Sequence, residues 1–234
     1  MTVNFPEFPT AGKEPISPAA TEALGHRATV ERGGIYARSL KRLFDIAAVV
    51  ITAPVTVPIV AVLAVFVAQD GGSPFYCQER VGKGRRPFRL WKLRSMVVDA
   101  DARMEACLAA DPLLRQEWNQ TQKLKADPRI TRVGRLLRKS SLDELPQLWN
   151  VLIGDMSLVG PRPMMTSQQA LYPGQAYYAL RPGLTGYWQI SERNESSFAD
   201  RAGYDDRYER DVSLATDIRV LFATLRAVAR GTGY

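Results

Sequence analysis

The clearest pattern in the chain is a stretch without charged residues at positions 46–68. Its length matches the ~20 apolar residues that a helix needs to cross a bilayer. It has no polar face, which favours a membrane helix over a buried helix of a soluble core. Pro54 and Pro58 lie inside it, and each removes an amide donor and kinks a helix. Thr52 and Thr56 can bond carbonyl groups that are freed nearby.

Basic residues flank this stretch on both sides. Lys41 and Arg42 precede it, and a run of arginines and lysines follows at positions 80–94. Because positive residues favour the cytoplasmic side of a membrane, a simple span would place one basic flank on the wrong side. We therefore expect a re-entrant helix that breaks near Ala53 and Pro54 and returns to the same face. A kinked full span is the alternative.

The rest of the chain divides around this helix. Residues 1–35 contain scattered prolines and charges without an apolar period, which predicts a disordered tail. This tail lacks the basic start and apolar run of a secretory signal. The re-entrant helix takes residues 36–70, and residues 71–234 form a domain on the cytoplasmic face.

Within that domain, alternating residues predict a β-hairpin with strands at 74–78 and 87–94. Helical spacing predicts helices at 99–125 (with a break at Pro112), 130–138, 142–153 and 218–228. The expected fold class is α/β and membrane-associated (monotopic). It combines a proline-broken re-entrant helix with a mostly helical domain that carries a small hairpin.

Composition narrows the chemistry. The net charge of +7 suggests nucleic acid, an anionic membrane or a phosphorylated substrate as partner, and the apolar stretch favours the membrane. Cys77 and Cys107 are too few for a disulfide framework or a cysteine metal site, and are expected to be reduced in a cytosolic setting. His26, the single histidine, lies in the tail, which argues against a Ser-His or Cys-His nucleophile. The groups that remain as candidates for catalysis are carboxylates, arginines and a hard metal ion.

Two adjacent carboxylates stand out, Asp143 and Glu144. The pattern from Ser141 to Glu144 also fits a capping box, although Pro146 suggests that a helix starts nearer Asp143. In either case backbone N–H groups would favour an ionised Asp143, as a nucleophile or metal ligand requires. The same groups would help to hold a phosphate.

Three arginines accompany the pair along the sequence: Arg138, Arg162 and Arg193. The planar fork of arginine matches two phosphate oxygens. Pro161 and Pro163 form a rigid turn that would fix the backbone at Arg162, and either X-Pro bond could be cis.

These motifs, taken in order, resemble one family, the bacterial monotopic phosphoglycosyl transferases. These are the polyprenyl-phosphate sugar-phosphate transferases of surface polysaccharide assembly. The resemblance covers about residues 38–230. The motifs that carry it are Lys41-Arg42-x-Phe44-Asp45, Gln78-x-Arg80-x-Gly82, Asp127-Pro128-Arg129-Ile130-Thr131, Ser141-Leu142-Asp143-Glu144-Leu145-Pro146-Gln147, Gly154-Asp155-Met156-Ser157-Leu158-Val159-Gly160-Pro161-Arg162-Pro163 and Arg181-Pro182-Gly183-x-Thr185-Gly186.

The resemblance implies an activity and a place. Family members lie at the cytoplasmic face of the bacterial inner membrane. They transfer a sugar phosphate from a nucleotide sugar, usually UDP-linked, to undecaprenyl phosphate and release UMP. Asp143 matches the family nucleophile, which forms an aspartyl-phosphosugar, and Glu144 matches its partner. Mg²⁺ is expected at the site, with Asp143 as a ligand.

The resemblance also assigns the supporting residues. Arg138, Arg162 and Arg193 match arginines near the bound phosphates, and Asp205 and Asp217 match acidic positions of the closing segment. One departure is Glu192, which places a negative charge next to Arg193 where the family often has glycine.

Two functions from other classes are the alternatives. A non-catalytic membrane scaffold of a polysaccharide assembly complex would leave the carboxylate pair and the arginines without a use. A basic nucleic-acid binder would leave the apolar stretch unexplained, so we expect no nucleic acid but inner-membrane lipids as partners. The short form without a further N-terminal membrane domain resembles exopolysaccharide-initiating members and favours galactose or glucose. Other sugars and a homodimer stay open.

Overall fold

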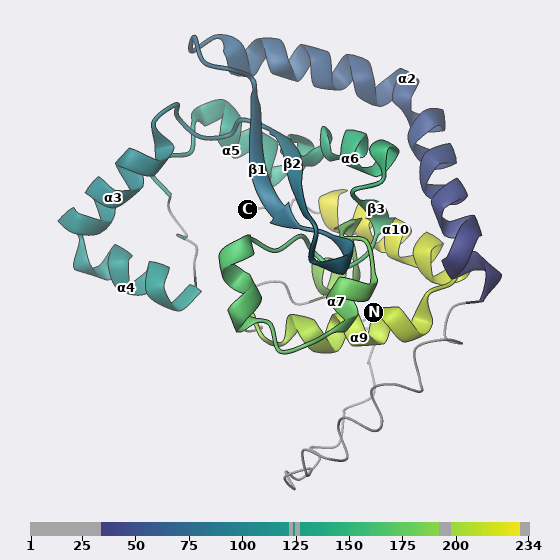
Figure 1. The fold of residues 1–234 in the computed structure, drawn as a ribbon. Helices are drawn as coiled ribbons and strands as arrows, with labels where there is room; N and C mark the ends of the chain where they lie inside the picture. The colour runs from purple at the N-terminus through teal and green to yellow at the C-terminus, as the bar shows by residue number, and fades with distance from the viewer. Residues whose placement is uncertain (1–33, 122–123, 125–126, 192–197, 230–234) are drawn as a thin grey trace, which may run out of the picture.

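The structure of the chain is a computed structural model that describes residues 34–121, 124, 127–191 and 198–229 (Figure 1). Most of the predicted tail and Arg193 lie outside this range. In chain order the elements are η1 (Tyr36–Leu40), α2 (Lys41–Ala68), β1 (Phe75–Val81), η2 (Lys83–Arg85), β2 (Pro87–Leu93), α3 (Ala100–Ala110), α4 (Pro112–Thr121), α5 (Arg132–Lys139), η3 (Leu142–Glu144), α6 (Gln147–Ile153), β3 (Ser157–Val159), η4 (Thr166–Leu171), α7 (Ala176–Ala179), β4 (Gly183–Thr185), α8 (Tyr187–Ile190), α9 (Arg201–Asp211) and α10 (Leu214–Ala229).

The apolar helix α2 follows one edge of the domain and bends midway along its length (Figure 1). It stays helical through Pro54 and Pro58, so the expected break at Ala53 and Pro54 is a bend inside a continuous helix. Thr52 contributes to the bend, because its hydroxyl donates to the carbonyls of Ala48 (2.8 Å) and Val49 (3.2 Å). Such bonds to the preceding turn often bend helices.

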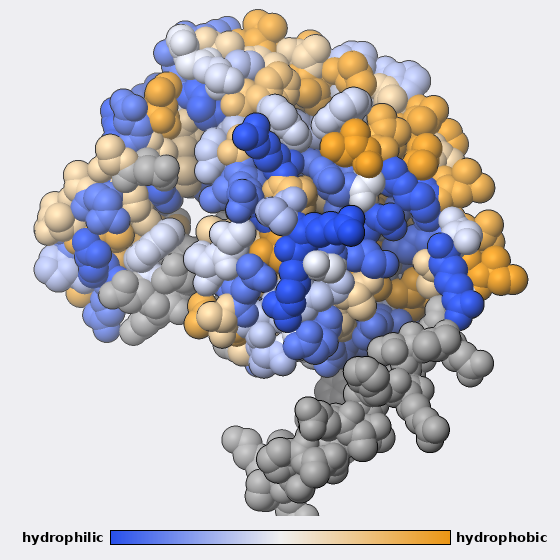
Figure 2. All heavy atoms as spheres, in the orientation of Figure 1, coloured by the Kyte–Doolittle hydropathy of each residue, from blue (hydrophilic) through white to orange (hydrophobic). Residues whose placement is uncertain are grey.

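The outer face of α2 is apolar and uncovered. Figure 2 shows hydrophobic residues gathered along the margin where α2 lies. Of the most apolar window of the helix only 6% is buried, which excludes a helix in the core of a soluble domain. Among the described residues, this is the one helix long and apolar enough to cross a membrane. The large exposed side chains are Leu43, Val50, Ile51, Val55, Val57, Ile59, Val62, Val65 and Phe66.

The inner face of α2 packs on the domain along both halves of the helix. In the first half, Val49 joins the main core beneath β2, α6 and β3. In the second half, Val67 joins a separate cluster with Leu93 and Leu137. Both ends of α2 are therefore fixed to the same body.

The charged residues at the start of α2 anchor it to three other elements. Lys41 Nζ contacts Asp217 Oδ2 at 2.6 Å. The guanidinium of Arg42 donates to the last carbonyls of α6, at Val151 (2.5 Å) and Leu152 (2.8 Å), which would otherwise lack partners.

Asp45 supplies the third anchor, although it lies on an apolar helix. It is 1% exposed, and its carboxylate accepts bonds from the Ser157 hydroxyl (2.7 Å) and the Leu158 amide (3.1 Å) of β3. A buried carboxylate needs such donors. The first motif of the sequence thus docks the apolar helix α2 onto the domain.

The predicted hairpin is confirmed. β1 and β2 pair in antiparallel register from Phe75 opposite Leu93 to Val81 opposite Pro87. Asn150 of α6 extends the pattern: its side chain accepts from Trp91 N (3.0 Å) and donates to Arg89 O (2.7 Å). This buried amide fixes α6 to the outer strand.

A second sheet was not predicted. β3 and β4 pair in parallel, with Ser157 opposite Gly183 and Val159 opposite Thr185. The strands touch so closely that a Cβ at Gly183 would lie 2.1 Å from the Gly160 nitrogen. Glycine is therefore required where the two glycine-containing motifs meet. Each strand has three residues, too few to give a period in the sequence.

The predicted helices are confirmed, although one of them changes type along its length and α9 was not predicted. The break at Pro112 separates α3 from α4, α5 matches the basic segment, and α10 closes the domain. The helix predicted at 142–153 begins as the 3-10 turn η3 and continues as the shorter helix α6, with Leu145 and Pro146 in helical backbone angles between them. All peptide bonds within the described residues are trans, including those before Pro161 and Pro163.

Candidate active site

Asp143 and Glu144 lie in η3, the short turn between α5 and α6. Ser141, directly before it, has left-handed backbone angles (φ 56°, ψ 19°) and makes no capping bond with its side chain. The predicted capping box is therefore wrong. Asp143 instead lies in the first turn of η3, ahead of α6, which begins at Gln147. A left-handed serine costs free energy, and here it turns the chain so that Asp143 points inward.

Lys92 faces this carboxylate pair. Its Nζ lies 2.7 Å from Glu144 Oε1 and 3.9 Å from Asp143 Oδ2. Sequence reasoning placed Lys92 only among the flanking basic residues. The strand period carried a signal, because Lys92 shares a face of β2 with the buried residues Phe88 and Leu90. A lysine on the inner face of a strand requires a partner.

The side chain of Asp143 is more buried than that of Glu144, at 9% and 20% exposure. Asp143 as a whole residue is 7% exposed, and burial raises the pKa of its carboxyl. The positive charge of Lys92 lowers this pKa, and the positive charge of Arg138 lowers it as well. The negative charge of Glu144 raises it. The surrounding cations therefore favour the ionised form that a nucleophile needs.

Arg138 is held beside Asp143 by the end of β2. Its Nε donates to the Ser95 hydroxyl at 2.8 Å. Close packing makes this possible, because a Cβ at Gly134 would lie 1.9 Å from the Ser95 carbonyl oxygen. Thr131 caps the same helix by accepting from Gly134 N at 2.8 Å. Burial lowers the pKa of Arg138, and the charge of Asp143 opposes that change.

Arg162 contacts the same oxygen of Glu144 as Lys92 does. Its Nη2 lies 3.6 Å from Glu144 Oε1, and the guanidinium lies 5.8 Å from the centre of the Trp188 ring. It follows β3 directly, between the partly or fully buried Pro161 and Pro163. The structure thus gathers two carboxylates, one lysine and two arginines. Arg193 lies outside the described residues.

The residues present fit a bound Mg²⁺ in one respect. Within the described ranges no group of three or more acidic, histidine or cysteine side chains could bind a metal together. However, Mg²⁺ in phosphate-transfer sites is commonly held by one or two carboxylates together with substrate phosphates. Asp143 and Glu144 supply that number of carboxylates.

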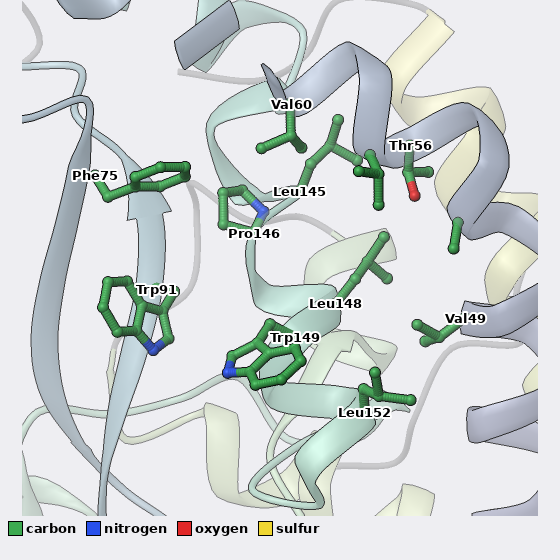
Figure 3. A pocket seen from close by; sticks show the side chains of 12 residues that line it. Val49, Thr56, Val60, Phe75, Trp91, Leu145, Pro146, Leu148, Trp149 and Leu152 are labelled. Atoms are coloured by element: carbon green, nitrogen blue, oxygen red, sulfur yellow. The ribbon is translucent and has the colours of Figure 1, made fainter.

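An apolar pocket of about 430 Å³ lies between α2, the β1–β2 hairpin and α6 (Figure 3). Leu145 and Pro146 line it and directly follow Glu144, while Trp91 lines it and directly precedes Lys92. The opposite wall is α2. In Figure 3 the side chains from β1, β2, α6 and α2 converge on the pocket. The complete lining is Val49, Ala53, Thr56, Val57, Val60, Phe75, Trp91, Leu145, Pro146, Leu148, Trp149 and Leu152.

Comparison with known proteins places this geometry in a family. The sequence profile described as "Bacterial sugar transferase" matches residues 36–231. The chain belongs to the bacterial sugar transferase family. The resemblance inferred from the motifs is thereby confirmed, since the profile covers all of them.

Three relatives of the sugar transferase are informative. It is 46% identical over 198 residues to the "UDP-galactose-lipid carrier transferase" of Erwinia amylovora, covering 84% of this chain and 42% of that protein. It is 44% identical to the "Undecaprenyl-phosphate galactose phosphotransferase" of Salmonella typhimurium, with the same coverages of 84% and 42%. It is 41% identical to the "Exopolysaccharide production protein ExoY" of Sinorhizobium fredii, covering 86% and 88%. The chain thus spans about two fifths of the first two relatives.

Asp217 lies in the body of the domain rather than among the arginines. It is 0% exposed and accepts bonds from Tyr36 (2.6 Å), Lys41 (2.6 Å) and Tyr208 (2.7 Å). These donors come from η1, α2 and α9, so Asp217 connects the start of the apolar helix to the closing helices.

Asp205 is also buried, at 5% exposure. It accepts a bond of 2.8 Å from the Tyr172 hydroxyl. Burial raises the pKa of Asp205 to about 7, although this bond and the charge of Arg201 lower it.

We expect Asp205→Asn to change the pH dependence of stability. Between the ordinary pKa of 3.8 and the folded value of about 7, the folded state keeps a proton that the unfolded state has lost. The free energy of unfolding of the wild type therefore falls as pH rises, by at most about 1.4 kcal/mol per unit. Relative to wild type, the variant should gain about 2 kcal/mol between pH 5 and pH 7. Urea unfolding at both pH values measures this, and a constant difference would refute it.

Proposed function

We propose that the sugar transferase moves a sugar 1-phosphate from a UDP-sugar to undecaprenyl phosphate and releases UMP. The observation that carries this proposal is the buried Asp143, set between Lys92, Arg138 and the Glu144–Arg162 contact. A carboxylate surrounded by cations suits attack on a phosphate, since the cations offset repulsion between like charges. The names of the Erwinia and Salmonella relatives agree with a lipid-carrier acceptor.

In the first step, an oxygen of Asp143 attacks the β-phosphorus of the donor. The bond from this phosphorus to the bridging oxygen breaks, and UMP leaves with that oxygen and its electron pair. The product is an aspartyl-phosphosugar. Arg162 lies where it can stabilise charge on the phosphate oxygens, and Lys92 holds Glu144 in place beside the nucleophile.

In the second step, a phosphate oxygen of the lipid attacks the same phosphorus, and the Asp143 carboxylate leaves. The lipid then carries a diphosphate-linked sugar, and the free enzyme is restored. Dividing the transfer in this way lets one site serve two bulky substrates in turn. Asp143 and the phosphate oxygens would hold Mg²⁺, which neutralises phosphate charge when bound.

A screen of UDP-sugars tests the activity. Purified protein with undecaprenyl phosphate and Mg²⁺ should release UMP from at least one of UDP-galactose, UDP-glucose and their N-acetylated forms. The absence of UMP release from all four would oppose the proposal. Galactose is favoured by the names of the two relatives above.

The packing of α2 supports a re-entrant placement in the cytoplasmic leaflet of the inner membrane. A helix that spans a bilayer has its ends on opposite sides, whereas Val49 and Val67 both pack on one domain. The exposed apolar face would enter the lipid, and the bend allows both ends to return to one surface. α10 adds exposed apolar side chains at helical spacing, Leu214, Ile218, Phe222 and Leu225, as expected for a helix at the membrane surface.

Cysteine labelling can test this topology. Ser73 is exposed just beyond the end of α2, so we expect Ser73→Cys to resist a membrane-impermeant thiol reagent added to intact cells and to react after lysis. Cys77 and Cys107 would be replaced by serine in the background. Efficient labelling of intact cells would indicate a full span instead.

The apolar pocket offers a place for the isoprenoid chain of the acceptor. Its lining runs from α2 to Leu145 and Pro146, which directly follow the carboxylate pair in the sequence, so a lipid in the membrane could present its phosphate without leaving the bilayer. The lining is almost free of polar groups, which suits a hydrocarbon chain.

Filling the pocket should impair use of the acceptor. We expect Val60→Trp to raise the KM for undecaprenyl phosphate by about tenfold, equal to about 1.4 kcal/mol, because the indole occupies the space of the chain. Single-turnover UMP release without acceptor should stay unchanged. Val55→Trp is the matched control, since Val55 lies on the same helix, is 64% exposed and does not line the pocket. Equal KM values for both variants would contradict this assignment.

A further inference from the structure

Three arginines from distant parts of the chain act on one another electrostatically, and one of them, Arg162, contacts Glu144 of the carboxylate pair. Arg80 comes from β1, Arg162 follows β3 and Arg201 begins α9. Arg162 and Arg201 share the Trp188 ring, with guanidinium carbons 5.8 Å and 4.1 Å from its centre. Arg201 also lies 4.5 Å from the centre of the Phe198 ring.

Two donor atoms of this arginine cluster have no hydrogen-bond partner among the described residues. Arg80 and Arg201 are half-buried, and the Nε of each is fully buried without a hydrogen-bond partner among the described residues. Arg80 Nη2 donates to Gln78 Oε1 at 2.5 Å, which holds the side chain in place but supplies no negative charge. Buried guanidinium groups normally have hydrogen-bond partners. For these two we therefore expect a hydrogen-bond acceptor that comes from a bound ligand.

The three charges also repel one another. Burial lowers the pKa of Arg201 to about 10, and the charges of Arg162 and Arg80 contribute to that decrease. Burial and then the charge of Arg162 lower the pKa of Arg80 as well. The nearby acids compensate only in part. Glu144 is already bonded to Lys92, and Asp205 has a pKa of about 7.

We propose that Arg80, Arg162 and Arg201 form an anion site that binds a phosphate group of a substrate. Phosphate is the chemistry that fits, since several planar guanidinium groups can share its oxygens. Arg162 connects this site to the carboxylate pair through Glu144. Arg80 and Arg201 thereby become binding residues of the proposed reaction, on which the inference about substrate phosphates rests. The phosphate belongs either to the nucleotide donor or to the lipid acceptor.

Equilibrium binding separates these two sources without any turnover. The full chain in detergent micelles would be titrated with UDP, with inorganic pyrophosphate and with undecaprenyl phosphate. Arg80→Met and Arg201→Met should each weaken binding of at least one probe by about tenfold or more. Loss confined to UDP and pyrophosphate assigns the site to the donor, and loss confined to undecaprenyl phosphate assigns it to the acceptor.

Arg207→Met is the matched control. Arg207 lies on the same helix as Arg201, its guanidinium carbon is 5.6 Å from the centre of the Tyr187 ring, and its side chain is 54% exposed. It removes the same charge without touching the cluster, so all three affinities should stay at the wild-type value. Unchanged affinity for every probe in both cluster variants would overturn the proposal.

Two further variants keep the test decisive if a methionine variant does not fold. Arg80→Lys and Arg201→Lys retain the charge but lose the planar fork, and should weaken binding by a smaller factor. Wild-type affinity for every probe in both lysine variants would also overturn the anion site.

The anion site and the proposed reaction can fail independently of each other. Binding of UDP does not require the nucleophile, so Asp143→Asn should bind it in the wild-type range. If that variant retained full activity while the arginine variants lost affinity, the covalent mechanism would fail and the anion site would stand. Normal affinity in the arginine variants with an inactive Asp143→Asn would give the reverse result.

Discussion

Asp143→Asn should lower the rate of UMP release by at least about 10⁴-fold, as expected when the attacking group of a covalent mechanism is removed. The amide has nearly the same shape as the carboxylate, so the fold around η3 should persist. It lacks the charge and nucleophilicity that attack on phosphorus requires. Initial rates of UMP release from the preferred UDP-sugar would measure the effect.

Glu144→Gln is the informative companion to this variant. Glu144 contacts Lys92 at 2.7 Å and Arg162 at 3.6 Å, which places it as a positioning group for both cations. We expect a large but incomplete loss of rate, because the nucleophile stays in place. If Asp143→Asn kept activity while Glu144→Gln abolished it, the two roles would have to be exchanged.

The second large effect is on stability. Asp217→Asn should lower the free energy of unfolding by about 3–5 kcal/mol, because it leaves the half-buried Lys41 without its counter-charge. It also weakens the bonds from Tyr36 and Tyr208 to the same carboxylate. For a chain of this size we expect the unfolding midpoint to fall by about 10 °C. Thermal unfolding in detergent measures this.

A matched variant nearby should behave differently. Asp211 is 41% exposed and pairs with Arg207 at 3.7 Å, so Asp211→Asn should cost about 1 kcal/mol or less. Equal midpoints for the Asp211 and Asp217 variants would show that Asp217 does not anchor the apolar helix.

Periodic patterns predicted the larger elements of the fold. The apolar helix, the hairpin and α3–α5 follow from residues that repeat every two or about 3.6 positions. The β3–β4 pair has no such signal, since it depends on close contact between Gly160 and Gly183 across the fold. The division between η3 and α6 was missed because Leu145 and Pro146, where it lies, keep helical backbone angles, so no turn residue marks it in the sequence.

The candidate site was predicted where a sequence motif contains the residue, and missed where only the fold brings residues together. Asp143, Glu144 and Arg162 lie in dense motifs. Lys92 reaches the site from a strand far away in the sequence, and Arg201 reaches the Trp188 ring near Arg162 from a distant helix. Asp217 was expected near the closing motif, and only its three bonds show that it anchors α2.

A direct test of the covalent mechanism is the mass of the protein after incubation with the preferred UDP-sugar and Mg²⁺ without acceptor. The wild type should gain the mass of one sugar phosphate, and peptide mapping should locate the adduct on Asp143. Addition of undecaprenyl phosphate should remove the adduct, and Asp143→Asn should never acquire it. An active wild type that forms no adduct under rapid quench, or an adduct on another residue, would contradict the mechanism.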